Sequence, residues 1–212
     1  MPFPSKEQLH KSREQRRRLS GHATRGFILD VATQCFAEFG FEVVSMRQIA
    51  KKAKLTAPAI YFYFEDKNAL YMACCSHIFS GMTQSLNKEL QRDEPAATKI
   101  HKFIHLLVKE LLTHPNTAKL FQRELVSTKK DILQFLKHEA FEETFKIFAH
   151  TLSEAMPVEN PELLAVSIYS LALGHIQFSQ VLESAGDTTL CFADKPEALA
   201  NHIIQLAGIP KS

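Results

Sequence analysis

Four aromatic residues stand in a row at positions 61–64, in the sequence Tyr-Phe-Tyr-Phe. Cationic side chains precede them at Arg47, Lys51 and Lys52. Tyrosine hydroxyls and basic side chains are typical donors to the phosphate oxygens of a nucleic acid. The chain contains no glycine-rich phosphate loop, H-E-x-x-H motif, nucleophile elbow or C-x-x-C pair. The stretch therefore indicates binding rather than catalysis, and we expect that the protein is not an enzyme.

Two short helices joined by a tight turn are predicted just before the aromatic run. Ser45 and Gln48 form an S-x-x-Q capping box, which satisfies two amides at a helix start. Thr56 is a good N-cap for the second helix. Pro58 falls in the first turn of that helix, where a missing N–H does no harm. Two helices with so short a connection and a cationic surround are typical of a helix-turn-helix.

We expect the aromatic run to end the second helix, with its side chains divided between two environments. Phe62 and Phe64 are predicted to be core residues, whereas Tyr61 and Tyr63 would present hydroxyls outward. In the alternative interpretation, the two tyrosines are themselves part of the domain core. Asp66 follows as the N-cap of a further, long helix.

The segment resembles the DNA-binding domain of the TetR family of bacterial transcriptional regulators over roughly residues 22–82. The residues that carry the resemblance are Phe36-Ala37-Glu38-Phe39-Gly40-Phe41, Ser45-Met46-Arg47-Gln48-Ile49-Ala50, Ile60-Tyr61-Phe62-Tyr63-Phe64 and Lys67-Asn68-Ala69-Leu70. Lys54 departs from the family pattern, which often has Gly where the first helix ends with a positive φ. Either the turn is built differently, or a strain on the order of 1 kcal/mol is tolerated because Lys54 reaches a phosphate.

The resemblance implies which side chains meet DNA. Ala57, Pro58 and Ala59 would face base edges, where they offer methyl and ring contacts to thymine but no bidentate hydrogen bonds. Specificity is therefore expected to depend on Arg47, Tyr61 and DNA shape. The candidates for the phosphate backbone are Arg47, Thr56, Tyr61, Tyr63 and Lys67, and Ser45 completes the DNA-binding set.

Charge is distributed unevenly along the 212 residues, although the formal net charge is only +2. Residues 1–70 carry 12 Lys and Arg against 7 Asp and Glu, a net charge of +5, and the rest of the chain carries −3. A basic N-terminal third suggests that this part of the chain meets a polyanion. Within it, residues 1–20 are expected to form a disordered or partly helical arm, which is either a solvated tail or a segment that lies on DNA.

The sequence shows no sign of export, membrane insertion or metal binding. The N-terminus is polar and basic without an apolar core, and no apolar run approaches the ~18 residues that span a bilayer. The four cysteines lack a zinc-like or disulfide-framework spacing, and His101 and His105 have no acidic partner of obvious register. We therefore expect a cytoplasmic protein with no membrane partner, no metal and no cofactor.

Periodic apolar residues predict an all-α protein of about nine helices in two domains. A three-helix DNA-binding domain is expected at residues 21–70, after the arm. Its first helix should start near Ala23 and stop at Gly40. The buried face of this helix is predicted to be Ile28, Ala32, Cys35, Phe36 and Phe39.

A larger helical domain for ligand binding and dimerisation is expected at residues 71–212. Its most regular apolar stripe lies in a helix at residues 97–114 and consists of Ile100, Phe103, Ile104, Leu107, Val108 and Leu111. Nine phenylalanines lie beyond residue 70, and most should be core. Aromatic-lined cavities also suit apolar ligands, and the resemblance implies an apolar or aromatic small-molecule effector. The candidate ligand-lining residues are Phe103, Phe121, Phe145, Tyr169, His175 and Phe178.

Two C-terminal helices, near residues 161–184 and 196–207, are expected to pair with a second copy of the chain, as the resemblance to TetR-family dimers implies. The first is rich in small residues between Ala165 and Gly174, which let two helices approach closely. His175 would either orient a ligand or bond across the dimer axis. A dimer would also place two recognition helices one DNA turn apart, roughly 34–36 Å, as a palindromic operator requires.

These patterns predict a sequence-specific DNA-binding transcriptional regulator. By resemblance it is a repressor, and a small-molecule inducer releases it by shifting the helix that begins near Asp66. In the alternative hypothesis, the protein is a helical ligand-binding or assembly protein whose basic N-terminus binds nucleic acid without sequence preference. The two hypotheses differ in whether the protein selects a particular DNA sequence.

Overall fold

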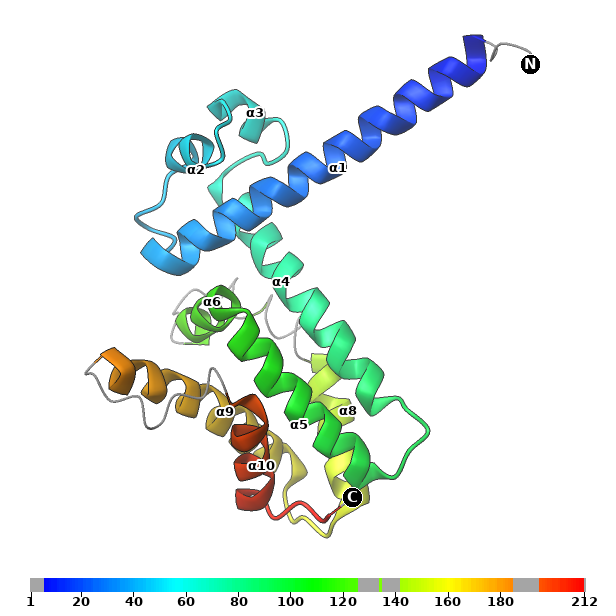
Figure 1. Cartoon of the computed structure of the whole chain (residues 1–212), viewed down its shortest axis with the longest axis vertical. Helices are drawn as coiled ribbons and strands as arrows, with labels where there is room; N and C mark the ends of the chain where they lie inside the picture. The colour runs from blue at the N-terminus through cyan, green and yellow to red at the C-terminus, as the bar shows by residue number, and fades with distance from the viewer. Residues whose placement is uncertain (1–5, 126–133, 135–141, 185–194, 212) are drawn as a thin grey trace. The chain divides into compact units, whose positions relative to one another are not determined.

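The computed structural model describes residues 6–125, 134, 142–184 and 195–211, and within them it contains helices and no strand (Figure 1). This confirms the all-α prediction. The helices are α1 (Lys6–Phe39), α2 (Met46–Lys52), α3 (Ala57–Tyr61), α4 (Lys67–Leu90), α5 (Ala96–Thr113), α6 (Pro115–Leu125), α8 (Glu142–Ala155), α9 (Pro161–Ser184) and α10 (Pro196–Leu206). Contacts divide the chain into two units, Met1–Cys75 and Ser76–Ser212.

Helix α1 begins at Lys6, inside the segment that was expected to form an N-terminal arm. It then continues to Phe39, so that the arm and the first helix are one element (Figure 1). The beginning of this segment is rich in Lys, Arg, Glu and Gln, which have high helix propensity, and the first glycine is Gly21. Gly40 ends the helix with a φ of +83°, as predicted.

The core of the first unit lies where α1, α2 and α3 meet. Ile28 and Phe36 of α1, Ile49 of α2 and Ile60 of α3 are fully buried. Helix α2 has seven residues and α3 has five, so neither is long enough to be stable by itself in water. Their positions therefore depend on burial of these side chains, each of which contributes about 1.5–3 kcal/mol.

The prediction that Phe39 belongs to this core is wrong, because 53% of the residue is exposed. Phe41 takes the space instead. Its ring centroid lies 6.1 Å from that of Phe36 and 5.0 Å from that of Tyr71. The turn at Gly40 reverses the chain, which brings Phe41 back over the end of α1 and leaves Phe39, the last helical residue, uncovered.

Helix α5 is the central element of the second unit and packs against α6, α8, α9 and α10. Its buried residues are Ile100, Phe103, Ile104, Leu107, Val108 and Leu111, which confirms the predicted stripe. His101 on the same helix lies with Nε2 2.9 Å from the carbonyl oxygen of Pro210, and so fastens the end of the chain to α5. The apolar period of residues 130–156 also predicts a helix, of which the structure describes residue 134 and α8.

Cys35, Cys74 and Cys75 are buried. Burial raises the pKa of the Cys74 thiol to about 12, and its Sγ donates to the carbonyl oxygen of Leu29 at 3.7 Å. Cys74 is therefore an uncharged packing residue at neutral pH. Elsewhere, no described helix is long and apolar enough to cross a bilayer, and the described residues include no group of three or more His, Cys, Asp or Glu placed to hold a metal.

Helix α2 ends in a Schellman motif built on a lysine. Lys54 follows the C-cap Ala53 and has a φ of +54°. Its N–H donates to the carbonyl oxygen of Lys51 at 3.2 Å, and the N–H of Leu55 donates to that of Ala50 at 2.9 Å. The turn thus has a positive φ at its left-handed position, where a residue that carries a Cβ takes a conformation that favours glycine.

Helix α10 ends in the same motif, but there the left-handed residue is Gly208, with a φ of +66°. The N–H of Ile209 donates to the carbonyl oxygen of Ile204 at 3.1 Å. This bond corresponds to the one from Leu55 to Ala50 in the α2 turn. A Cβ added at Gly208 would meet no atom within 4 Å, so that only the backbone conformation opposes a side chain there. The two turns form a natural pair for measuring the strain at Lys54.

We predict that Lys54→Gly raises the free energy of unfolding of the first unit by about 1 kcal/mol, because glycine adopts a positive φ without the Cβ clash. Gly208→Ala, the reverse change in the same motif, should lower the stability of the second unit by a similar amount. Amide hydrogen exchange read by mass spectrometry would follow each unit separately. An unchanged first unit, together with a destabilised second unit, would contradict strain at Lys54.

Candidate functional site

The helix-turn-helix is shaped by side chains that cap its two helices. The N–H of Ser45 donates to Gln48 Oε1 at 2.7 Å, and the N–H of Gln48 donates to Ser45 Oγ at 3.3 Å, which confirms the predicted capping box. Thr56 Oγ1 accepts from the N–H of Ala59 at 3.4 Å. These short-range bonds place the beginnings of both helices, and hence the side chains that follow them.

Two of the candidate DNA-binding residues, Ser45 and Thr56, are also N-caps, and this limits the hydrogen bonds that each can make to DNA. The Ser45 hydroxyl also donates to Gln48 Oε1 at 2.8 Å, so its hydrogen is engaged within the capping box. The Thr56 hydroxyl accepts one bond as a cap, and its own hydrogen is still available to a phosphate oxygen. We therefore expect Ser45 to position α2 rather than to contact DNA, whereas Thr56 remains a candidate phosphate contact.

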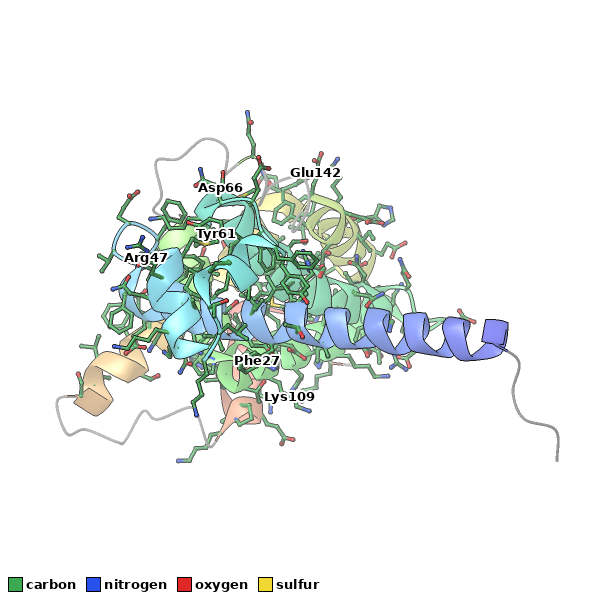
Figure 2. All side chains as sticks on the ribbon, turned by 90° about the horizontal axis from the view of Figure 1, so that it is seen from above. Phe27, Arg47, Tyr61, Asp66, Lys109 and Glu142 are labelled. Carbon is green, nitrogen blue, oxygen red and sulfur yellow. The ribbon has the colours of Figure 1, made fainter. Side chains whose placement is uncertain are left out.

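Arg47 on α2 and Tyr61 on α3 project from neighbouring helices and are both exposed (Figure 2). Tyr61 has 51% of its surface exposed, which contradicts the alternative that places it in the core. Pro58 is also exposed, whereas Ala57 is half-buried. Tyr63 is half-buried beside Phe62. The exposed part of the motif thus includes a guanidinium, a phenol and the apolar ring of Pro58.

Lys67 has a different environment from the other candidates. Its Nζ donates to the carbonyl oxygen of Phe41 at 2.9 Å and lies 4.3 Å from the centroid of the Phe41 ring. An ammonium group over an aromatic face is attracted by the electrons of the ring. Lys67 therefore connects the start of α4 to the loop after α1. A phosphate contact would have to use the ammonium hydrogens that do not bond to the Phe41 carbonyl.

The prediction that Phe62 is a core residue is wrong, because 81% of it is exposed. Phe64 is buried as predicted, with 4% exposed. Helix α3 ends at Tyr61, and Phe62 is its C-cap with a helical φ of −64°, so the aromatic run turns through the last part of a helix rather than alternating as in a strand. Phe62 is the residue of the exposed surface that the sequence interpretation missed.

The candidate ligand-lining residues are not brought together in one place. Phe103, Phe145 and Tyr169 belong to one aromatic cluster, in which Phe103 stacks on Phe148 at 4.1 Å and Tyr169 stands edge-on to both. Phe103 and Phe148 are fully buried, so this part of the cluster is packed core. Phe145 and Tyr169 are half-buried at its edge, and burial of the phenol oxygen raises the pKa of Tyr169.

The other candidates lie elsewhere. His175 and Phe178 line a surface hollow of about 570 Å³ whose described lining residues all come from α9. His175 Nδ1 lies 2.8 Å from the carbonyl oxygen of Leu171, and its ring stands edge-on to that of His202 on α10 at 5.4 Å. The side chain of Phe121 lies outside the described residues. Phe103, Phe145 and Tyr169 thus share one aromatic cluster, whereas His175 and Phe178 line a hollow on α9. That these residues bind a ligand stays a prediction.

Three comparisons connect this geometry to known proteins. A family model described as bacterial regulatory proteins, tetR family, matches residues 28–74. The HTH-type transcriptional regulator RutR of Escherichia coli (strain K12) is 24% identical over 172 residues, which cover 79% of this chain and 81% of RutR. The uncharacterized HTH-type transcriptional regulator YhgD of Bacillus subtilis (strain 168) is 27% identical over 95 residues, 45% of this chain, and the chain spans half of its length.

Among solved structures, the transcriptional regulator FadR from Bacillus subtilis, in complex with stearoyl-CoA, has the same fold. Its TM-score is 0.69 at 19% sequence identity, and the match covers 85% of this chain and 96% of FadR. The motif and these matches define the chain as a helix-turn-helix protein of the class formed by bacterial transcriptional regulators. Within that class, the TetR family is the one whose model matches residues 28–74, the segment that contains the helix-turn-helix. The relatives that match are regulators and not enzymes, as expected from the sequence.

We predict that Lys67→Met lowers the free energy of unfolding of the first unit by about 1–2 kcal/mol, because it removes the bond to the Phe41 carbonyl and the contact with its ring. Lys51→Met is the matched control, since Lys51 is exposed on α2 and its loss should change stability by less than about 0.5 kcal/mol. Denaturant unfolding measures both variants. If Lys67→Met were as stable as the control Lys51→Met, Lys67 would have no positioning role.

Proposed function

We propose that the chain is a transcriptional regulator that binds a palindromic operator as a homodimer and is released by an apolar small molecule. The observation that carries the DNA-binding part is the exposure of Arg47, Pro58 and Tyr61 on the α2–α3 motif of a TetR-family domain. RutR and YhgD, which are named as transcriptional regulators, support the regulatory part.

Cationic side chains around the motif support a contact with phosphate. Lys51, Lys52 and Lys54 are exposed at the end of α2. Lys52 Nζ lies 3.6 Å from Glu38 Oε2, but both side chains are exposed, and such pairs contribute little to stability. Lys52 can therefore exchange this carboxylate for a phosphate. Each phosphate that the protein neutralises adds about −0.9 to the slope of log affinity against log salt.

An apolar face on α9 supports dimer formation. Leu163, Val166, Phe178 and Val181 are between 48% and 72% exposed, and Leu206 on α10 is 57% exposed. Contiguous exposed apolar surface of this kind marks a contact site. From residue 163 to residue 181 the sequence contains no Asp, Glu, Lys or Arg. A two-fold contact places the same surface on itself, so an uncharged face suits a second copy of this chain.

Small residues on the same face support a close approach of two copies. Ser170 and Gly174 line the hollow on α9, between the larger exposed side chains of Val166 and Phe178. A Cβ added at Gly174 would meet no atom within 4 Å, so its absence is not required by packing inside the chain. A glycine at position 174 is explained if α9 of a second copy of the chain crosses at this point.

The aromatic cluster of the second unit supports an apolar effector. Phe145 and Tyr169 are half-buried at the edge of this cluster and would contact the ligand, while Phe103 and Phe148 form its packed base. FadR from Bacillus subtilis, which shares the fold, is known in complex with stearoyl-CoA. A long-chain acyl compound is therefore the first effector class to test.

Release by an effector requires that DNA and ligand favour different states of the dimer. Helix α4 contains residues of both units, from Lys67 at the DNA-binding motif to Leu90. A displacement of α4 on effector binding would change the separation of the two recognition helices. The two half-sites would then no longer be met at a spacing of roughly 34–36 Å.

Selection of random duplex DNA by the purified protein at about 0.15 M salt tests the proposed function. We predict recovery of a two-fold symmetric motif. Recovery of no motif, with binding that fades as salt rises, would contradict this proposal and favour the alternative of a helical ligand-binding or assembly protein.

With the motif as probe, stearoyl-CoA should release the protein, whereas acetyl-CoA, which lacks the long apolar chain, should not.

Gly174→Leu tests the dimer face. The free chain has room for the new side chain, so we predict an intact fold but a shift from dimer to monomer in sedimentation, because the close approach of two α9 helices is blocked. Gly81→Leu is the matched control, since Gly81 also lies within a helix with no atom within 4 Å of an added Cβ. A Gly174→Leu variant that stays dimeric would place the interface elsewhere.

A further inference from the structure

Phe62 is the most exposed large apolar side chain in the described part of the chain, at 81%. Its backbone is relaxed, with a φ of −64° and a ψ of −32°. Its ring stands edge-on to that of Tyr63, with centroids 5.1 Å apart and planes at 88°. The ring is therefore presented to solvent in a defined orientation, although the fold of the first unit does not need it for packing.

Phe62 shares a face of the recognition helix with Pro58. The N–H of Phe62 donates to the carbonyl oxygen of Pro58 at 3.0 Å, so the two residues are one helical turn apart. Residues four apart on a helix lie on the same side. Pro58 is exposed as well. We call this pair, Pro58 and Phe62, the apolar recognition face.

The chemistry of the major groove limits what such a face can contact. Base edges there carry hydrogen-bond donors and acceptors, and the one apolar group among them is the 5-methyl of thymine. The start of α3 consists of Ala57, Pro58 and Ala59, which offer no hydrogen-bonding side chain. An apolar recognition face in the groove would therefore favour thymine over cytosine, whose edge presents an amino group without a methyl.

We propose that Phe62 packs, together with Pro58, against thymine 5-methyl groups in each half-site and so determines part of the sequence specificity. This inference rests on the proposed function, because it requires that the α2–α3 motif enters the major groove of a preferred site. It differs from the role expected for Arg47 and Tyr61, which are polar contacts. It also makes the methyl group itself, rather than the base pair, the recognised feature.

Deoxyuridine provides the test, since it differs from thymidine in the duplex only by the missing methyl group. In the selected operator, each thymine is replaced singly by deoxyuridine, and the dissociation constant is measured for the wild-type protein and for Phe62→Ala. We expect one or two positions in each half-site at which deoxyuridine weakens wild-type binding about fourfold, the value for one buried methyl group. Phe62→Ala should weaken binding to the thymine operator and show no further loss at those positions.

Phe39→Ala is the matched control, because Phe39 is also an exposed phenylalanine of the first unit, at 53%, but lies at the end of α1. It should leave both the affinity and the deoxyuridine effect unchanged. The salt dependence of binding should be the same for Phe62→Ala as for the wild type, since no phosphate contact is removed. A changed salt slope would show that the substitution disturbs phosphate contacts of the neighbouring cationic side chains, and would contradict a purely apolar role for Phe62.

Equal losses for Phe62→Ala on thymine and deoxyuridine operators would overturn the inference and would indicate insertion of the ring between bases. A selected operator without thymine near the recognition helix would overturn it as well. Both outcomes leave sequence-specific binding intact. Recovery of no preferred sequence contradicts the proposed function itself, so the two failures are distinguishable.

Discussion

The ring of Tyr71 is the contact on which the helix-turn-helix depends. It meets the Phe36 ring edge-on at 4.9 Å and the Phe41 ring at 5.0 Å, and it is fully buried. These contacts fix the start of α4 against the end of α1. Lys67 adds a charged bond to the same place, since its ammonium reaches both the carbonyl and the ring of Phe41. Helices α2 and α3 are too short to be stable by themselves in water, and Phe36, which meets the Tyr71 ring, belongs to the same core in which Ile49 and Ile60 are buried.

Local signals in the sequence predicted the parts of the fold that depend on neighbouring residues. The capping box of Ser45 and Gln48 and the cap at Thr56 form as expected, because an N-cap bond joins residues three apart and needs no distant partner. Asp66 caps α4 in the same way, with Oδ1 accepting from the N–H of Ala69 at 2.7 Å. The stripe of α5 was predictable because a long helix with one broad apolar face has one way to be buried.

The features that sequence reasoning missed depend on where a helix stops in space. Phe62 was assigned to the buried face at the end of a helix, but α3 ends at Tyr61 and Phe62, its C-cap, is exposed. Phe39 fits the apolar period of α1, but Phe41, which follows the Gly40 turn, is the residue whose ring stacks on that of Phe36. Aromatic residues of the second unit were grouped by type alone, and type does not reveal that Phe178 belongs to an outward face of α9.

The buried thiols of the first unit can report how often that unit opens, through the rate at which they are alkylated. Cys74 is closed to solvent and burial raises the pKa of its thiol to about 12, so an alkylating reagent cannot modify it while the domain is closed. Modification requires opening of the packing between α1 and α4, and its rate reports how often that opening occurs. Because Cys35, Cys74 and Cys75 are natural residues of the first unit, its opening can be followed in the intact chain, with or without operator, and no substitution is needed to create a labelling site.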